Sequence, residues 1–356
     1  EEIEFKIAAE IDHFLNVYPE KKSNMLDHLR GISNINNGFI SSLDSNFSEL
    51  PINMVEALNL ALDLLLKLDQ NVVLIGEDIG ATGGVFRVTK ELQSKYGTTR
   101  VLDFPIAESL LCGSAIGMSL ANLKPIVEIQ FFGFCYPILD HLINHATRYR
   151  NRTRGQRCCP IIFRIHFGGN IQAPEHHGEN LEAIFAVIPG LKVVIPSSPQ
   201  QAFGLLVTSY YQNDPVVILE HIKLYRYKKS MVDFKKLIPL DKAFVAHSGS
   251  DISIIAWGFQ VQLALSIADQ LSDKISIEVI DLCSIHPLDI ETLYKSLSKT
   301  KKGIILQESP QGLSIASEII ASIHERNDLN EKIILKRISP PQAIVPYAKM
   351  EEHYFP

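Results

Sequence analysis

The sequence predicts an α/β protein with parallel sheets that are covered by helices on both faces. Short continuous apolar runs, of which residues 71–76 are the first, are typical of buried strands. Helical patterns separate these runs along most of the chain. The alternation stops at residues 221–240, which are basic and irregular, and then restarts. Because 356 residues suffice for about two domains, we place a domain boundary in this interval.

The first domain is expected to span residues 51–228 and to begin with a helix. Asn53 stands three residues before Glu56, which is the spacing of a capping box, and the apolar residues 55–66 follow. Strands are expected at 71–76 and near 100–104, 125–131, 160–166, 191–195 and 215–219. Helices are expected near 87–95, 107–121, 136–150, 180–187 and 199–212.

The second domain is expected at residues 241–356, after a linker at 229–240. Its apolar runs predict strands at 252–257, 275–281, 303–307 and 332–338. Helical patterns predict helices at 259–272, 289–299 and 311–325. This second unit is therefore a smaller α/β domain.

The N-terminal region differs from both domains. Apolar residues recur at helical spacing from Ile3 to Tyr18, and Pro19 ends the run, so we expect a separate amphipathic helix over residues 1–18. Residues 19–50 are rich in Asn and Ser without periodicity, and we expect a linker there.

Composition excludes several classes of function. A net charge of −6 and a pI near 6.1 give no electrostatic basis for binding nucleic acid or an anionic membrane surface. No apolar run reaches the length of about 18 residues that a membrane span needs. The five cysteines lack metal-ligand spacing and have apolar neighbours, which favours reduced thiols and a cytoplasmic protein.

The candidate site residues follow predicted strands. The sequence has no dinucleotide-binding, P-loop, zinc-protease or nucleophile-elbow motif. Ligands of open α/β sheets bind beyond the carboxyl ends of strands. The polar residues expected there are Glu77, Asp78, Glu108, Gln130 and the glycine-bearing loop 166–179 with adjacent His176 and His177.

Four features of the sequence have more than one interpretation from the residues alone: Glu108, the histidine pair, an aromatic cluster and a basic run. Glu108 could simply complement the dipole of the helix that follows it. The two histidines could be ordinary surface residues, and their spacing disfavours a metal site. The aromatic cluster 131–136 could be core or a cofactor platform, and the basic run 148–157 could be a solvated helix end or a surface for an anionic partner.

Taken together, an ordered set of segments resembles the beta subunit of the thiamine-diphosphate-dependent decarboxylating component of 2-oxo acid dehydrogenase complexes. Pyruvate dehydrogenase and branched-chain 2-oxo acid dehydrogenase belong to this group. The resemblance covers residues 53–356, and the segments that carry it are 74–78, 83–89, 105–108, 128–131, 137–140, 177–179, 189–194, 214–220, 281–289 and 352–356.

The resemblance implies a pyrimidine-binding α/β domain followed by a transketolase-type C-terminal domain. It implies that Glu108 hydrogen-bonds the aminopyrimidine of thiamine diphosphate and tunes its acid–base chemistry. Ile106, Gln130 and Phe134 are expected to contact this ring. His177, rather than His176, matches the histidine that handles protons during decarboxylation and acyl transfer to lipoamide.

The resemblance also implies bound ions and partners. A potassium ion is expected near Ile161, Ser209, Tyr210, Gln212 and Asp214. Magnesium is expected to bind outside this chain, because no G-D-G…N-N motif is present, and an alpha subunit should therefore hold metal and diphosphate. The first residues resemble the last helix of such a subunit, so we expect a natural alpha–beta fusion. The implied assembly is alpha2beta2-like, with a second beta copy, and it docks on a lipoyl acyltransferase core.

Some residues depart from the family pattern. Val187 stands where a histidine is frequent, Cys283 where arginine is usual, and the Pro-x-Pro near the C-terminus is altered at residues 341–346. Two alternatives remain open: the C-terminal half of a transketolase or deoxyxylulose-phosphate synthase, and a docking subunit that has lost its chemistry. Bacterial cytoplasm is the expected location, with the mitochondrial matrix or a plastid as alternatives.

Overall fold

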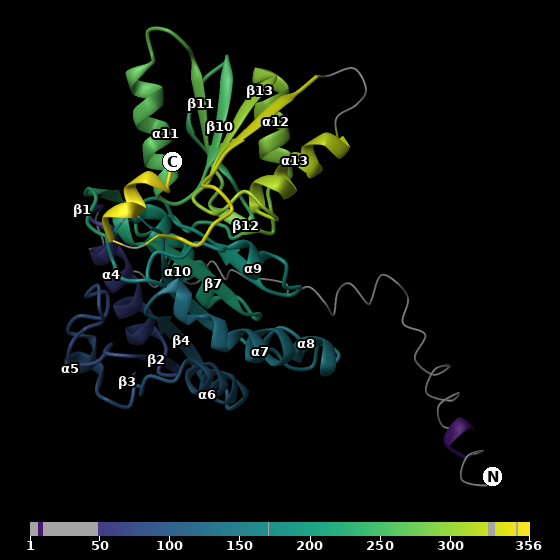
Figure 1. The fold of residues 1–356 in the computed structure, drawn as a ribbon. Coiled ribbons are helices and arrows are strands. Elements are labelled where there is room, and N and C mark those ends of the chain that lie inside the picture. The colour runs from purple at the N-terminus through teal and green to yellow at the C-terminus, as the bar shows by residue number, and fades with distance from the viewer. Residues whose placement is uncertain (1–5, 10–48, 170, 327–331, 347) are drawn as a thin grey trace.

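The structure, a computed structural model, describes residues 6–9, 49–169, 171–326, 332–346 and 348–356 (Figure 1). Residues 6–9 are helical and exposed. The rest of the expected N-terminal helix and nearly all of the linker at 19–50 lie outside the described residues. None of the described helices is both long enough and apolar enough to cross a membrane.

A seven-stranded sheet forms the first half of the molecule, in the order β12-β6-β7-β5-β4-β2-β3. Its parallel strands are β2 (Val72–Gly76), β3 (Val101–Asp103), β4 (Lys124–Ile129), β5 (Ile162–Phe167), β6 (Lys192–Val194) and β7 (Val216–His221). The edge strand β12 (Ser284–His286) runs antiparallel to β6 and comes from the second half of the chain. The predicted parallel sheet is confirmed.

Helices cover both faces of this sheet. On one face lie α4 (Met54–Leu68) and α10 (Pro199–Tyr210), and on the other lies α6 (Glu108–Leu120). Side chains of a strand alternate between the two cores: Val72 and Leu74 face α4, whereas Val73 and Ile75 face α6. The predicted capping box of α4 is present, with Asn53 and Glu56 each bonded to the backbone of the other.

Several expected helices are shorter or broken. The single helix expected at 136–150 is wrong: the chain forms a succession of short turns, namely η1 (Phe132–Phe134), η2 (Tyr136–Ile138), α7 (Leu139–His141), the π-helical η3 (Leu142–Ala146) and α8 (Tyr149–Arg152). At 87–95 only α5 (Leu92–Tyr96) is helical, because Arg87 and Glu91 adopt positive φ angles that a helix excludes. At 180–187 only α9 (Ala183–Ala186) forms.

Short strands absent from the expectations tie distant segments together. Strand β1 (Leu50–Ile52) pairs antiparallel with β8 (Ser230–Val232), which lies in the segment interpreted from the sequence as a linker. The same segment buries Phe234, Ile238 and Leu240 against α4 and α10. Residues 229–240 therefore pack on the first unit.

The second unit is a five-stranded sheet in the order β14-β13-β10-β11-β9. Its strands are β9 (Phe244–His247), β10 (Ile252–Ala256), β11 (Ile277–Asp281), β13 (Lys302–Leu306) and β14 (Ile334–Ile338), and β9 alone runs antiparallel. Helix α11 (Phe259–Gln270) covers one face, and α12 (Ile290–Thr300) and α13 (Ile315–Arg326) cover the other (Figure 1).

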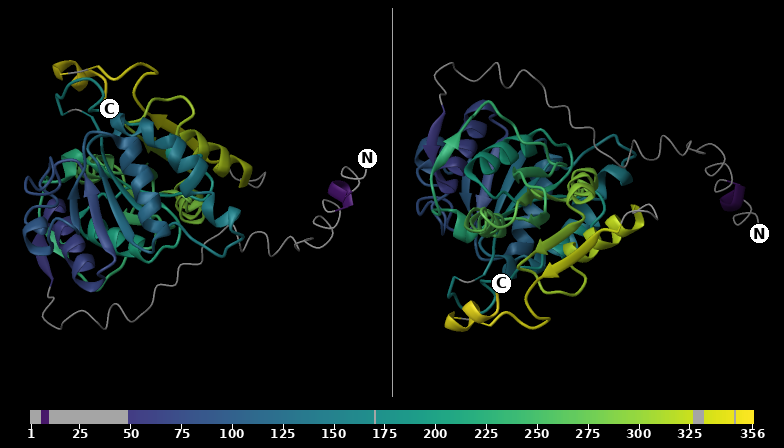
Figure 2. Two further views of the ribbon diagram at one scale, coloured as in Figure 1. Left: turned by 90° about the horizontal axis from the view of Figure 1, so that it is seen from below. Right: turned by 90° about the horizontal axis from the view of Figure 1, so that it is seen from above.

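The two units share a core and buried polar contacts. Residues of β10, β13 and α13 belong to the same apolar cluster as β4, β5 and α6. Trp257 donates to Glu182 at 3.1 Å, and Ser197 donates to Asp281. The chain ends in the 3₁₀ turn η5 (Ala348–His353), which returns to the first unit beside the loop after β5 (Figure 2).

Candidate active site

The carboxyl ends of β5, β4, β2 and β3 lie next to one another in the seven-stranded sheet. The predicted site residues follow these strands: Glu77 after β2, Glu108 after β3, Gln130 after β4, and the loop with His177 after β5. Parallel neighbours bring these positions to one edge of the sheet, where ligands of open α/β sheets bind. The structure therefore gathers them as the strand-end argument predicted.

Glu108 is the first residue of α6 and is half-buried. Just after β3, the Phe104 N–H donates to the Gly76 carbonyl at the end of β2, and the chain then turns through Pro105 into α6. Ala107, at the cap position, supplies no side-chain acceptor for the N–H groups of the first turn, and its own backbone N–H bonds to the Glu77 carboxylate. Next to Glu108 in the sequence, the Ile106 side chain is 86% exposed.

A second carboxylate lies beside Glu108. Glu77 is buried, and its Oε1 has no hydrogen-bond partner. Burial raises the pKa of Glu77, and the nearby carboxylate of Glu108 raises it further. Gln130 reaches across from β4: its Nε2 lies 3.2 Å from Asp78 Oδ2 and 3.4 Å from the Glu77 carbonyl. Sequence reasoning named Glu77 and Asp78 as strand-end residues but did not foresee the coupling of the two glutamates.

The structure brings His177 and Phe134 into contact. The imidazole lies 5.2 Å from the Phe134 ring and 4.4 Å from the Phe131 ring, measured between centroids. Its Nδ1 lies 3.0 Å from the Glu175 carbonyl, which can only accept a hydrogen bond. Nδ1 therefore carries the hydrogen in the neutral ring, and Nε2 is the atom that can accept a proton. His176 is more exposed, and its Nδ1 lies 3.3 Å from Glu179 Oε1.

Below the aromatic cluster lies a buried charge network that the sequence did not reveal. Arg164 on β5 bonds to Glu128 on β4 at 2.7 Å and to Glu220 on β7 at 2.6 Å. Tyr225 adds a hydrogen bond to Glu220 at 2.6 Å. His166 lies alongside, and its burial lowers its pKa, so the ring is neutral. The network fixes the spacing of three strand ends beneath the site.

The residues expected to bind potassium lie together at the opposite ends of the strands. The Ile161 carbonyl accepts from Val216 at 2.9 Å. Asp214 accepts from Arg150 Nε at 2.6 Å, and Gln212 accepts from the Lys192 ammonium group. Two cations thus already approach this group, and potassium binding stays a prediction.

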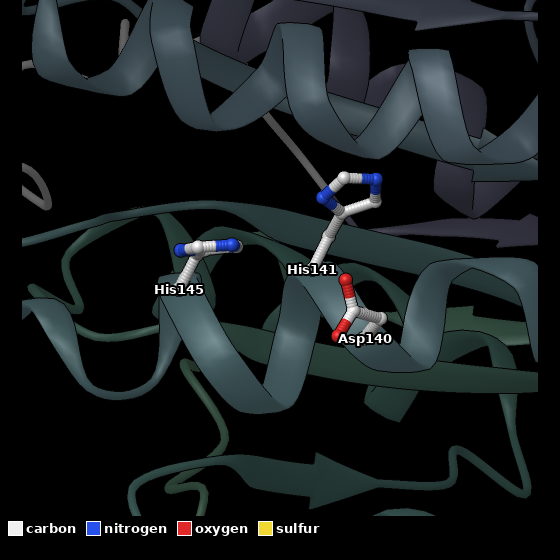
Figure 3. A group of neighbouring side chains, drawn as sticks. All are labelled: Asp140, His141 and His145. Atoms are coloured by element: carbon white, nitrogen blue, oxygen red, sulfur yellow. The ribbon is translucent and has the colours of Figure 1, made fainter.

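Asp140, His141 and His145 form a group whose ligand atoms lie within 4.8 Å of one another (Figure 3). Asn144 donates to Asp140 at 2.7 Å, and Arg152 NH1 lies 3.4 Å from His145 Nδ1. Because a guanidinium repels a metal cation and Asp140 is exposed, we assign no metal here. Among the described residues, no other group of His, Cys, Asp and Glu side chains has this geometry.

The sheet edge suits one half of thiamine diphosphate. A half-buried carboxylate beside an exposed isoleucine suits a pyrimidine, which has polar ring nitrogens and apolar faces. The unpartnered Glu77 oxygen marks a polar group that the chain alone leaves unsatisfied. These features suit the pyrimidine ring of such a cofactor.

Comparisons with known proteins place the fold in a class. Residues 51–228 match the transketolase pyrimidine-binding domain family, and residues 241–356 match the transketolase C-terminal domain family. Among solved structures, a split-gene transketolase described as an inactive beta4 tetramer superposes with a TM-score of 0.64 over 85% of this chain and 93% of its own, at 20% identity. The molecule is a transketolase-type α/β protein.

Sequence relatives define the family within this class. The chain is 42% identical over 305 residues to the pyruvate dehydrogenase E1 component subunit beta of Bacillus subtilis, covering 85% of this chain and 94% of the relative. It is 44% identical over 309 residues to the same subunit of Acholeplasma laidlawii, covering 86% and 94%. The chain belongs to the family of E1 beta subunits of 2-oxo acid dehydrogenase complexes.

The departures from the family pattern fall in three separate places. Val187 follows α9 and is 77% exposed. Cys283 is buried in the core beneath α4 and α10, and all five cysteines are free thiols. The Pro341 carbonyl accepts a hydrogen bond from Tyr354 at 3.2 Å. Residues 344–346 of the altered Pro-x-Pro segment line a small cavity together with His176 and Glu351, so this departure lies beside the loop that carries His177.

Proposed function

We propose that this chain supplies the beta half of an active site that decarboxylates a 2-oxo acid with thiamine diphosphate and transfers the acyl group to lipoamide. Pyruvate is the substrate we propose first, because the relatives are named for pyruvate dehydrogenase. The position of Glu108 carries the proposal. This carboxylate begins a helix that has no side-chain cap, at the edge of the sheet where the parallel strands end, and it lies next to the exposed Ile106.

Each residue of the site has a defined task in this proposal. When bound, thiamine diphosphate supplies an electron sink for the carbanion that loss of CO₂ leaves. Glu108 hydrogen-bonds a pyrimidine nitrogen and thereby controls where a proton resides. Ile106 and Phe134 contact the ring and exclude water, and Gln130 orients the loop after β2 through Asp78. His177 accepts and returns a proton at Nε2 during acyl transfer.

The proposal includes partners. An alpha partner, fused or separate, holds Mg²⁺ and the diphosphate, because the relatives are named as one subunit of their enzyme and this sequence has no G-D-G…N-N motif. The structural neighbour described as an inactive beta4 tetramer is consistent with a beta chain that requires this partner. A second beta copy, a lipoyl acyltransferase core, a cytoplasmic location and the potassium ion belong to the same proposal.

Coexpression of this chain with its alpha partner tests the proposal. The purified complex, with thiamine diphosphate and Mg²⁺, is assayed with pyruvate, with branched-chain 2-oxo acids and with a sugar-phosphate acceptor. We expect decarboxylation of pyruvate and acylation of lipoamide by the complex, and no turnover by this chain alone. Activity confined to branched-chain substrates would correct the substrate, and transfer to a sugar phosphate would overturn the proposal in favour of a transketolase-type enzyme.

A further inference from the structure

The loop that carries His177 has almost no regular structure, yet residues far along the chain hold it. It runs from Gly168 to Asn180, between β5 and α9, and residue 170 lies outside the described residues. Backbone N–H groups in such a loop need partners where water is excluded. Three of them, from Gly169, Ile171 and Gln172, donate to carboxylates of the second unit.

Glu351 is the carboxylate at the centre of this contact. It lies on the C-terminal turn η5 and is only 1% exposed. Its Oε2 accepts from Ile171 N at 2.7 Å and from Gln172 N at 3.0 Å. A Cβ atom on Gly178 would lie 3.1 Å from the other oxygen, Oε1. Glu351 therefore contacts both limbs of the loop, one of them directly beside His177.

Glu308, just after β13, bonds to residues at both ends of the loop. It accepts from Asn180 Nδ2 at 3.0 Å and from Gly169 N at 3.4 Å. His221 and Gln260 donate to the same carboxylate at 2.9 and 2.8 Å. Burial alone would raise the pKa of Glu308, but His221 and the other donors lower it below the usual range, so the carboxylate is charged.

The opposite side of the loop packs on the candidate active site. The His177 ring lies against Phe131 and Phe134, and a Cβ on Gly133 would come within 2.3 Å of the His176 carbonyl oxygen. The loop is thus enclosed between the aromatic residues after β4 and the C-terminal turn. Both views of Figure 2 show the end of the chain beside this loop.

We propose that Glu351 is a positioning residue for His177, with Glu308 as the second anchor of the same loop. This inference rests on the proposed function, because it takes His177 as the residue that handles the proton. A displacement of about 1 Å at a catalytic group can lower a rate about 100-fold. Glu351 therefore helps to set the position of the imidazole, although it lies in the other unit.

Kinetics of the complex with the alpha partner test the proposal. We expect Glu351→Ala to lower kcat for lipoamide acylation about tenfold or more, since two hydrogen bonds to a charged acceptor are lost. Glu351→Gln keeps an oxygen acceptor and should retain most of the rate. Glu352→Gln, on the exposed face of the same turn, is the matched control and should equal the wild type.

A double-mutant cycle separates positioning from general damage. If Glu351 acts through His177, the Glu351→Ala effect disappears in a His177→Ala background. An equal loss in both backgrounds, or a wild-type rate for Glu351→Ala, would overturn the proposal.

Hydrogen–deuterium exchange on the full chain provides a readout that does not depend on activity. Glu351→Ala should accelerate exchange of the Ile171 and Gln172 amides about tenfold or more, whereas Glu352→Gln should not. Unchanged exchange would overturn the proposal even in an active complex. If the wild-type complex were inactive while exchange behaved as expected, the proposed function would fail and the hold of Glu351 on the loop would stand.

Discussion

Glu108 and Glu308 both follow a strand that pairs in parallel with its neighbours, yet the surroundings of the two carboxylates differ. Glu308 is 4% exposed and accepts hydrogen bonds from His221, Gln260, Asn180 and Gly169. Glu108 is half-buried, and within the described part of the chain no donor bonds to its side chain. A carboxylate whose donors all come from its own chain is structural, whereas one left open beside an exposed isoleucine is available to a ligand.

Glu182 is an intermediate case that explains the difference. It is fully buried and accepts from Trp257 at 3.1 Å and from Ser309 at 2.8 Å, but its Oε2 has no partner. Burial raises the pKa of Glu182 to about 7. The pKa of Glu308 instead falls, because its donors include His221 and outweigh burial. The number and charge of the donors, rather than burial alone, decide which carboxylate is ionised.

The largest effect is expected from removing the structural carboxylate. Glu308→Ala leaves His221, Gln260 and Asn180 without a partner in a buried site, and should lower the free energy of unfolding by about 3–5 kcal/mol. Urea unfolding of the full chain measures this. Glu108→Ala is the control and should cost less than about 1 kcal/mol, and similar losses for both variants would contradict the comparison.

The Glu182→Gln variant should differ from the wild type in how its free energy of unfolding depends on pH. A folded pKa near 7, above the usual 4.5, means that the folded state retains a proton that the unfolded state releases. The wild type therefore loses stability as the pH rises from about 4.5 to 7. The variant, which cannot ionise, should be more stable than the wild type by roughly 1–3 kcal/mol at pH 8 and equal to it near pH 4.5.

Thermal or urea unfolding at these two pH values tests the Glu182 prediction. A difference between variant and wild type that does not change with pH would show that Glu182 ionises normally in the folded protein.

A smaller effect on stability is expected at Ile106, at the edge of the sheet that carries the candidate site. Ile106→Ala removes an exposed side chain, so the stability of the chain should change by less than about 0.5 kcal/mol. In the complex with the alpha partner, the thiamine diphosphate concentration for half-maximal activity should rise about tenfold, because apolar contact with the ring is lost. Val245→Ala, at a 51% exposed position on β9, should change neither quantity. An unchanged cofactor requirement would remove Ile106 from the site.

The sequence predicted the parts of the molecule that depend on local patterns. Continuous apolar runs identified β2, β4 and β7, and the capping box at Asn53 identified the start of α4. The rule that ligands bind at strand ends placed Glu77, Glu108 and Gln130 at one edge. These inferences succeeded because each depends only on residues a few positions apart or on strand direction.

The features that escaped prediction depend on contacts between distant residues. Strands β1 and β8 have only three residues each and are stabilised by pairing with one another, so neither has a pattern of its own. The break of the helix at 136–150 comes from 3₁₀ and π turns in a segment whose residues look helical. Glu351 lies 180 positions from Ile171 in sequence, and no local pattern connects them.

The rate of 2-oxo acid decarboxylation by the complex carrying Glu108→Gln tests the central claim most directly. The substitution keeps the size of the side chain and removes its ability to exchange a proton. At saturating thiamine diphosphate and Mg²⁺, the account predicts a loss of about 100-fold or more in kcat, with unchanged assembly and a stability within about 1 kcal/mol of the wild type. A wild-type rate from the assembled Glu108→Gln complex would contradict it.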